Sequence, residues 1–201
     1  MYPSGDNNTK NPFFDNLYRD RRDIHHDLNA NLYAIVKLPF GFEYQMNFTP
    51  RYHWYEYMNH ESAEHPEWAG DGGRSERKNE KTFNWQVDNI LRWKKEFGED
   101  HRVEATFLQN AEKGQWWKTV AQNKLYSPSD ILGFHNIGAG TAPSVSSEDT
   151  YKTGDALMGR LFYSFKDKYM LTASVRRDGY SAFGSMNPHA VFPAVALGWV
   201  F

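Results

Sequence analysis

The stretch at residues 157–201, LMGRLFYSFKDKYMLTASVRRDGYSAFGSMNPHAVFPAVALGWVF, decides the fold class of this chain. Odd-numbered positions are mostly apolar on both sides of the charged segment 166–168, and even-numbered positions are mixed or polar. Side chains of a strand alternate between two faces, so this pattern predicts a hairpin with one apolar face. Residues 191–201 repeat the apolar alternation after a longer loop. The stretch therefore predicts a three-stranded antiparallel meander.

The preceding residues predict four more strands. Apolar and polar residues alternate over 28–38, 42–58, 82–94 and 101–111, which is the period of a strand with one apolar face. Residues 1–26 are polar and turn-rich and predict a loop, with a short strand before Leu28 as the alternative, and a short helix is expected near 116–122. The sequence thus predicts an all-β antiparallel meander of about seven strands.

The lengths of the connections indicate where such a sheet resides. Short turns at 39–41, 97–100 and 166–168 alternate strictly with long loops at 59–81, 112–154 and 178–190. In a meander, all short turns then lie at one end of the sheet and all long loops at the other. Outer-membrane barrels have this arrangement, with short periplasmic turns and long extracellular loops. We therefore expect part of the wall of a large transmembrane β-barrel, with the three long loops extracellular.

The composition agrees with this interpretation and excludes several classes of protein. The 201 residues include 12 Tyr, 14 Phe and 7 Trp, while the mean hydropathy is only −0.77. No apolar run is long enough for a transmembrane helix, whereas a barrel with a wet lumen combines these features. Cysteine is absent, which excludes disulfides and thiolate metal sites. A formal net charge of −2 gives no electrostatic reason to expect nucleic acid as a partner.

The motif RRDGYSAFG (176–184), followed by FPAVALGWVF (192–201), resembles the SusC/RagA family of TonB-dependent outer-membrane transporters of Bacteroidetes. We expect the motif residues to be structural, with the Asp-Gly pair forming a turn and the arginines paired with acidic neighbours. A contact to substrate or to a lipoprotein lid is the alternative. The residues that carry the resemblance are Arg176, Arg177, Asp178, Gly179, Phe183, Gly184, Phe192, Pro193, Gly198 and Trp199.

The resemblance implies a barrel of roughly 22 strands, filled by a plug domain that this chain lacks. We therefore expect residues 1–201 to be an internal piece of a longer barrel; the first residues carry no secretory signal. The implied partners are the TonB complex (through the absent plug region), a SusD-like surface lipoprotein, outer-membrane lipid, and a glycan or peptide substrate. The resemblance implies no cofactor.

Six aromatic residues in or beside the expected long loops are candidates for substrate contact, because flat apolar rings stack on sugars. Packing between loops or an interfacial girdle is the alternative. These residues are Trp54, Tyr55, Tyr57, Trp68, Trp116 and Trp117. His53, His60 and His65 have no metal-ligand spacing, so no metal site is predicted.

No nucleophile–base motif or phosphate-binding glycine loop is present, so an enzyme is not predicted. The first functional hypothesis is a segment of a TonB-driven importer of oligosaccharides or similar large nutrients. The alternatives are a passive porin-like or structural outer-membrane barrel, and a soluble carbohydrate-binding β-sandwich.

Overall fold

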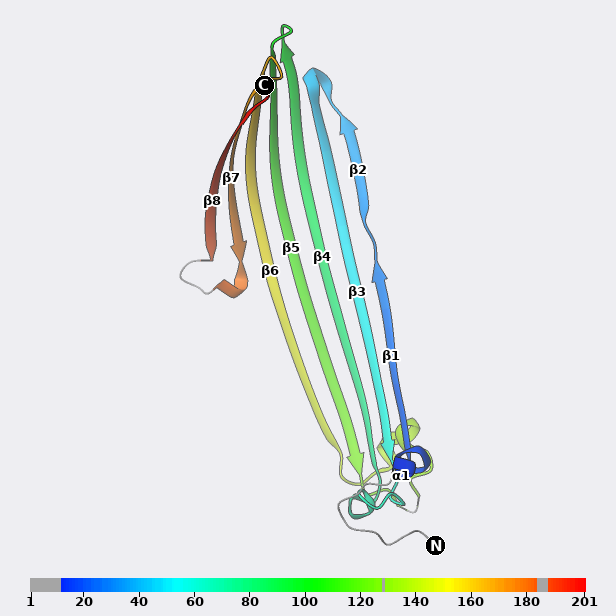
Figure 1. Ribbon diagram of the computed structural model, residues 1–201. Helices are drawn as coiled ribbons and strands as arrows, with labels where there is room; N and C mark the ends of the chain where they lie inside the picture. Colours follow the sequence, from blue (N-terminus) through cyan, green and yellow to red (C-terminus); the bar gives the residue numbers. More distant parts are fainter. Residues whose placement is uncertain (1–11, 128, 184–187) are drawn as a thin grey trace. The chain divides into compact units, whose positions relative to one another are not determined.

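The computed structural model describes residues 12–127, 129–183 and 188–201. They form one antiparallel sheet of eight strands in the order β1-β3-β4-β5-β6-β7-β8, with β2 also paired to β3 (Figure 1). The predicted all-β meander is confirmed, and the sheet is open rather than closed on itself. The elements are α1 Pro12–Tyr18, β1 Arg19–Asn29, β2 Leu32–Lys37, β3 Phe42–Glu61, β4 Arg74–Phe97, β5 His101–Lys124, β6 Ser144–Phe165, β7 Tyr169–Tyr180 and β8 His189–Trp199, with short 3-10 turns at Pro39–Gly41, Ala69–Asp71, Gly133–Ala139 and Ser181–Phe183.

Several strands are longer than predicted, so the three long connections are shorter. Strand β4 already begins at Arg74, β5 continues to Lys124 and β6 begins at Ser144. The connections are therefore 62–73, 125–143 and 181–188, in place of the expected 59–81, 112–154 and 178–190. The added start of β4 is polar on both faces, and the added parts of β5 and β6 show no regular apolar alternation, so they lack the period from which strands are predicted.

Two local predictions are wrong. The helix expected near 116–122 is part of β5, because ladder pairing with its neighbours satisfies the backbone of this segment. The loop expected over 1–26 contains α1, and the alternative of a strand before Leu28 is confirmed by β1; residues 1–11 lie outside the described part. Pro12 opens α1, where its missing N–H has no helical partner to lose.

The three short turns are confirmed. Strand β3 follows Pro39–Gly41 directly, and the other two turns occupy 98–100 and 166–168. Lys166 and Asp167 both have positive φ, as the central residues of the turns favoured in hairpins do. The two turns also touch, since the Lys166 N–H donates to the Asp100 carbonyl at 2.6 Å.

The chain divides into two compact units. Within the described residues, unit 1 comprises 12–27, 53–81, 116–127 and 129–149. Unit 2 comprises 28–52, 82–115, 150–183 and 188–201, and it contains the three short turns.

In unit 2 the two faces of the sheet differ in polarity. Antiparallel pairing places Leu161, Ala173 and Val195 in one row, and Tyr163, Leu171 and Leu197 in the next. Large apolar side chains of this face are open to the surroundings; Val195 is 72% exposed and Leu197 83%. Among the described residues of unit 2, Ala156 is the only hydrophobic residue that is buried. An apolar face this continuous needs a partner or a lipid environment.

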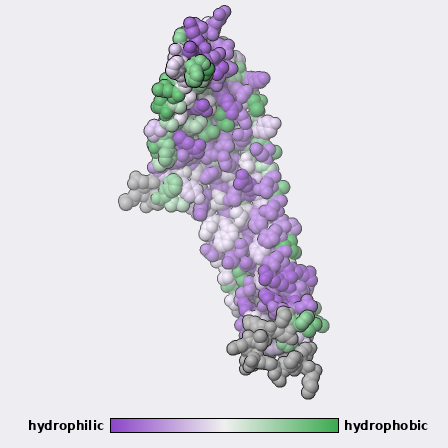
Figure 2. Space-filling view, viewed as in Figure 1, coloured by the Kyte–Doolittle hydropathy of each residue, from purple (hydrophilic) through white to green (hydrophobic). Residues whose placement is uncertain are grey.

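The opposite side of the sheet is mainly hydrophilic. The face seen in Figure 2 is largely hydrophilic, and hydrophobic residues are visible mostly at its margins. None of the helices in the described part is long and apolar enough to cross a membrane.

Unit 1 has a small core of its own. Phe134, from the connection 125–143, is 2% exposed, and Met58 and Tyr126 are also buried. Asp130 joins the two long connections of this unit, because its carboxylate accepts the N–H of Ala63 at 2.8 Å. Lys124 adds an ion pair to Asp71 at 2.8 Å. The connections 62–73 and 125–143 therefore form a packed cap.

Candidate functional site

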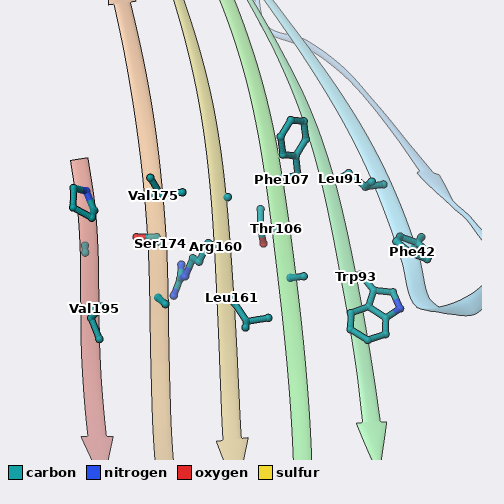
Figure 3. A pocket seen from close by; sticks show the side chains of 15 residues that line it. Phe42, Leu91, Trp93, Thr106, Phe107, Arg160, Leu161, Ser174, Val175 and Val195 are labelled. Carbon is teal, nitrogen blue, oxygen red and sulfur yellow. The ribbon is translucent and has the colours of Figure 1, made fainter. Parts of the chain in front are cut away.

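The apolar face of unit 2 contains a groove of about 550 Å³ (Figure 3). Small residues form its floor: Ala105 of β5, Gly159 of β6 and Ala173 of β7. Phe107, Leu161 and Val175 are among the larger side chains that flank them. The groove is apolar and open, which suits a flexible hydrocarbon chain better than a polar solute.

The polar face of unit 2 is a network of ion pairs and amide hydrogen bonds. Arg92 of β4 donates to Glu43 at 3.1 Å and to Gln45 at 2.8 Å, both on β3. Farther along β4, Asp88 accepts the side-chain N–H of Asn110 at 2.6 Å. A polar recess of about 200 Å³ lies among Arg102, Glu104, Thr106, Arg160 and Phe162. This face suits contact with water and with polar ligands.

Unit 1 carries a cluster of aromatic and charged side chains, which we call the tyrosine face: Tyr55 and Tyr57 of β3, Arg21, Asp23 and His25 of β1, and Lys78 of β4. The Lys78 ammonium lies 4.9 Å from the Tyr55 ring centroid and 5.3 Å from that of Tyr57. The Arg21 guanidinium lies 5.3 Å from the Tyr57 ring centroid, and His25 stacks on Tyr55 at 4.5 Å. Rings and cations thus alternate across three strands.

Three ionisable groups of the tyrosine face have shifted pKa values, and the hydrogen bond to Asp23 raises that of Arg21. The Tyr55 hydroxyl donates to Asp23 at 2.7 Å, and this hydrogen bond, together with one from Arg21, lowers the pKa of Asp23. Burial, followed by the proximity of Asp23, raises the pKa of Tyr55 to about 12. At neutral pH the face therefore presents a carboxylate beside a neutral phenol.

The structure separates the six predicted aromatic residues by location. The side chains of Gln122 and Glu76 meet at 2.8 Å, so the even positions of β5 share a side with the even positions of β4. Trp116 therefore lies on the side of Lys78, with Tyr55 and Tyr57. Trp54 packs against Lys81, an odd position of β4, at 5.5 Å, so it lies on the other side.

Trp117 and Trp68, the remaining two candidates, also lie apart from Trp116 and the two tyrosines. Trp117 lies on the same side as Trp54, because it is an odd position of β5. Trp68 belongs to the connection 62–73, where the Arg74 guanidinium lies 5.7 Å from its ring centroid. The structure thus brings Tyr55, Tyr57 and Trp116 to one side and leaves Trp54, Trp68 and Trp117 elsewhere.

Most motif residues lie in strands, and Phe183 belongs to the 3-10 turn Ser181–Phe183. Asp178 and Gly179 belong to β7, which continues to Tyr180, so the predicted Asp-Gly turn is wrong. Pairing on both sides of β7 holds this segment extended despite the local turn signal. Arg176 does pair with an acidic neighbour, because its Nε lies 2.7 Å from Asp178.

The other motif residues contact neighbouring strands or turns. Phe183 makes an edge contact with Tyr180, with ring centroids 5.4 Å apart. Phe192 pairs with Arg176, and Pro193 with Val175. Gly198 and Trp199 pair with Met170 and Tyr169 beside the short turn. Gly184 lies outside the described residues.

Sequence reasoning missed a buried polar network in unit 1. The His60 Nδ1 lies 2.9 Å from Ser75 Oγ, and its Nε2 lies 3.6 Å from Asp130. The composition matches a Ser-His-Asp triad, but Ser75 is 0% exposed, so no substrate reaches its hydroxyl. The spacing of these residues gave no signal, because the contact depends on the long connection folding back. The network anchors the cap to β3 and β4.

The three histidines considered for metal binding have separate partners. His53 contacts Asp27 at 2.7 Å, His60 belongs to the network above, and His65 contacts Asp15 at 3.2 Å. Within the described ranges, no three metal-ligating side chains gather at one point.

No family model matches the chain, but individual relatives do. TonB-dependent receptor P26 of Formosa agariphila is 29% identical over 135 residues, or 66% of this chain and 13% of that protein. TonB-dependent receptor P39 of the same organism is 32% identical over 58% of this chain and 11% of the relative. TonB-dependent receptor SusC of Bacteroides thetaiotaomicron is 32% identical over 44% of this chain and 8% of the relative. The chain resembles a segment of the SusC/RagA-like TonB-dependent receptors.

Solved structures show the same fold. The RagAB peptide transporter superposes with a TM-score of 0.82 at 19% identity, over 92% of this chain and 20% of the matched chain. The RagAB peptide importer in its open-open state gives a TM-score of 0.79 over the same shares. The eight strands therefore correspond to part of the wall of a RagA-type barrel, and the predicted resemblance is confirmed. The chain spans between 8% and 13% of the length of these curated relatives.

Proposed function

We propose that this chain forms part of the barrel wall of an outer-membrane active transporter, which imports oligosaccharides or similar large nutrients and is driven by TonB. The observation that carries the proposal is the sequence similarity to TonB-dependent receptors, including 32% identity to SusC over 91 residues. The polarity of the sheet supports it, since transmembrane strands alternate between lipid-facing apolar and lumen-facing polar residues.

The two faces and the two ends of the strands then have defined environments. The apolar face with Leu161 and Val195 contacts lipid, and the ion-paired face with Arg92 lines the lumen. The turns at 39–41, 98–100 and 166–168 face the periplasm, and the connections 62–73, 125–143 and 181–188 are extracellular, as outer-membrane barrels arrange their turns and loops.

The tyrosine face is the proposed region of substrate contact within this segment. The rings of Tyr55 and Tyr57 lie among the charges of Arg21, Asp23 and Lys78. Because lumen-facing positions of a barrel are polar, we assign this side, with Trp116, to the lumen wall. Aromatic rings stack on sugar rings, and the same surface also accepts peptide side chains. RagAB, which shares this fold, is a peptide transporter, so glycan and peptide are both candidate substrates.

The proposed partners follow from the relatives. A SusD-like lipoprotein is proposed to cover the extracellular side, and the TonB complex to act through a plug region supplied by the rest of the protein. The motif residues from Arg176 to Trp199 are proposed to be structural. No catalytic role is proposed for any residue.

Uptake by the complete transporter tests the proposal. The gene that contains this chain is expressed in an outer membrane, and uptake of labelled oligosaccharides and peptides is followed before and after collapse of the proton gradient. We expect uptake to stop on collapse. Uptake that continues would indicate a passive barrel. The single sheet of the described residues already argues against the carbohydrate-binding sandwich, which needs two packed sheets.

A further inference from the structure

The apolar face of unit 2 ends at a row of polar residues. Tyr44 of β3 donates to Asn89 of β4 at 2.5 Å, and Asn89 donates to Gln109 of β5 at 2.7 Å. Each of the three lies an even number of residues from an apolar position on its own strand, and therefore on the same face of the sheet. Those apolar positions include Phe42, Leu91 and Phe107, which line the groove. The amides satisfy one another, as polar groups at the margin of a low-dielectric region must.

Arg177 of β7 lies on the same face, at a matching distance from the short turns. It is eight residues from the start of β7 at Tyr169 (177 − 169 = 8). Gln109 is likewise eight residues from the start of β5 at His101 (109 − 101 = 8). Eight residues span about 26 Å along a strand, or about 20 Å along the membrane normal at a tilt of about 40°. The apolar band of such barrels is about 25 Å tall, so a long arginine side chain reaches its outer boundary.

The surroundings of Arg177 leave its charge available. It pairs across the sheet with Leu157 on one side and Val191 on the other, both apolar. One row farther on, Asp155 is engaged by His189 at 3.4 Å. No carboxylate in the described part of the chain pairs with Arg177, which is exposed. An unpaired guanidinium at the edge of an apolar face favours an anionic ligand.

The groove begins next to Arg177, on the side nearer the short turns. Val175, two residues earlier on β7, lines it together with its cross-strand neighbours Gly159 and Pro193. A Cβ at Gly159 would meet nothing within 4 Å, so the space directly above this backbone is open. A cation above an open apolar groove complements a molecule that has a phosphate head and a hydrocarbon tail.

We propose that Arg177 and the groove below it bind one phosphorylated glycolipid of the outer leaflet. The Arg177 guanidinium contacts the lipid phosphate, and an acyl chain lies over Gly159, Ala173 and Val175. The choice of the outer leaflet rests on the proposed function, because it depends on the short turns being periplasmic. The other membrane source of phosphate, a glycerophospholipid, is an outcome of the test.

The test uses the complete transporter, purified from outer membranes and stripped of lipid. Binding of lipid A, of dephosphorylated lipid A and of phosphatidylglycerol is then measured for the unaltered protein and for Arg177→Gln, Arg176→Gln and Gly159→Leu. Arg176, on the opposite side of the same strand and paired with Asp178, is the matched control. Gly159→Leu places a side chain in the groove, where a Cβ would meet nothing within 4 Å.

We expect Arg177→Gln to weaken lipid A binding about tenfold, the effect of one lost charge-assisted hydrogen bond. Binding of dephosphorylated lipid A should not change, and Arg176→Gln should behave like the unaltered protein. Gly159→Leu should weaken both forms of lipid A. Equal lipid A affinity for Arg177→Gln and the unaltered protein, or equally tight binding of phosphatidylglycerol, would overturn the inference. Absence of the protein from the outer-membrane fraction would instead overturn the proposed function, and this inference with it.

Discussion

The carboxylate of Asp155 on β6 and the imidazole of His189 on β8 meet above the backbone of Gly179, with Oδ1 and Nε2 3.4 Å apart. A Cβ at Gly179 would overlap the Asp155 Oδ1 and lie 2.7 Å from the His189 Nε2. The absence of a side chain on β7 thus lets a polar side-chain contact join the two strands that flank it. This contact explains a glycine of the RRDG motif without invoking a turn.

Replacement of Gly179 should therefore destabilise the barrel. Gly179→Val forces Asp155 and His189 apart and overpacks the strand, a change that costs about 1–3 kcal/mol. The measurement is the thermal unfolding midpoint of the complete transporter in detergent. Gly159→Val is the control, because that position has open space. Equal midpoints for the two variants would contradict this account of the motif glycine.

The cap of unit 1 should loosen in acid. Burial acts to raise the pKa of Asp130, but hydrogen bonds from the Ala63 N–H and the Ser62 hydroxyl, together with the nearby His60, outweigh it and lower the pKa below its ordinary value of 3.8. Because the folded-state pKa is depressed, the stabilisation is fully present above about pH 4 and is lost as the pH falls through the lower folded value.

Hydrogen exchange of the connections 62–73 and 125–143 between pH 7 and pH 2.5 measures this effect, after correction for the intrinsic exchange rates. We expect protection to be constant down to about pH 4 and then to fall. Asp130→Asn should give weaker protection throughout this range, with no acid transition. An acid transition that persists in Asp130→Asn would assign it to another group.

Aromatic residues on the two sides of unit 1 should differ in their effect on uptake. Tyr55→Ala, Tyr57→Ala or Trp116→Ala removes a ring from the proposed lumen wall, and a ring stack of about 1 kcal/mol corresponds to about fivefold in affinity. Trp54→Ala and Trp117→Ala are matched controls on the other side. The apparent affinity for labelled oligosaccharide and peptide, measured at equal amounts of protein in the outer membrane, checks the difference. Equal losses on the two sides would argue against substrate contact through this face.

The sequence predicted the elements that bear an apolar period and missed those that lack one. The predicted strand 42–58 nearly coincides with β3, because its rings and polar residues alternate. The start of β4 was missed, since Glu76, Lys78 and Glu80 alternate with residues that are also polar. Ladder hydrogen bonds stabilise such a segment, and a single sequence does not reveal its partner strand.

The candidate site was predictable by residue type but not by location. Aromatic side chains stood out in the sequence, whereas their division between two sides of the sheet depends on cross-strand register. The Gln122–Glu76 contact, between residues 46 positions apart, fixes that register. The Asp178–Gly179 pair shows the converse error. Its sequence predicts a turn, but pairing with β6 and β8 holds it in an extended strand.

Adjacent positions of β8 should respond oppositely to the same charge. Val195 lies on the apolar face beside Ala173 and Leu171, whereas the side chain of Ala194 points to the polar side beside Ser174. An arginine on the lipid face of a barrel costs about 2–4 kcal/mol near the midplane, and lumen positions accept charge. Val195→Arg should therefore reduce the amount of folded transporter in the outer membrane, and Ala194→Arg should leave it unchanged.

The amount of heat-modifiable, detergent-resistant barrel in outer-membrane fractions measures this difference. Both side chains are exposed in the sheet, so steric overlap with the rest of this chain does not distinguish the two variants. If Ala194→Arg is the damaging change, the polar face contacts lipid and the assignment of the two faces is reversed. If both variants assemble equally well, neither face lies in the hydrocarbon layer. Only a selective defect in Val195→Arg agrees with an apolar face turned toward lipid.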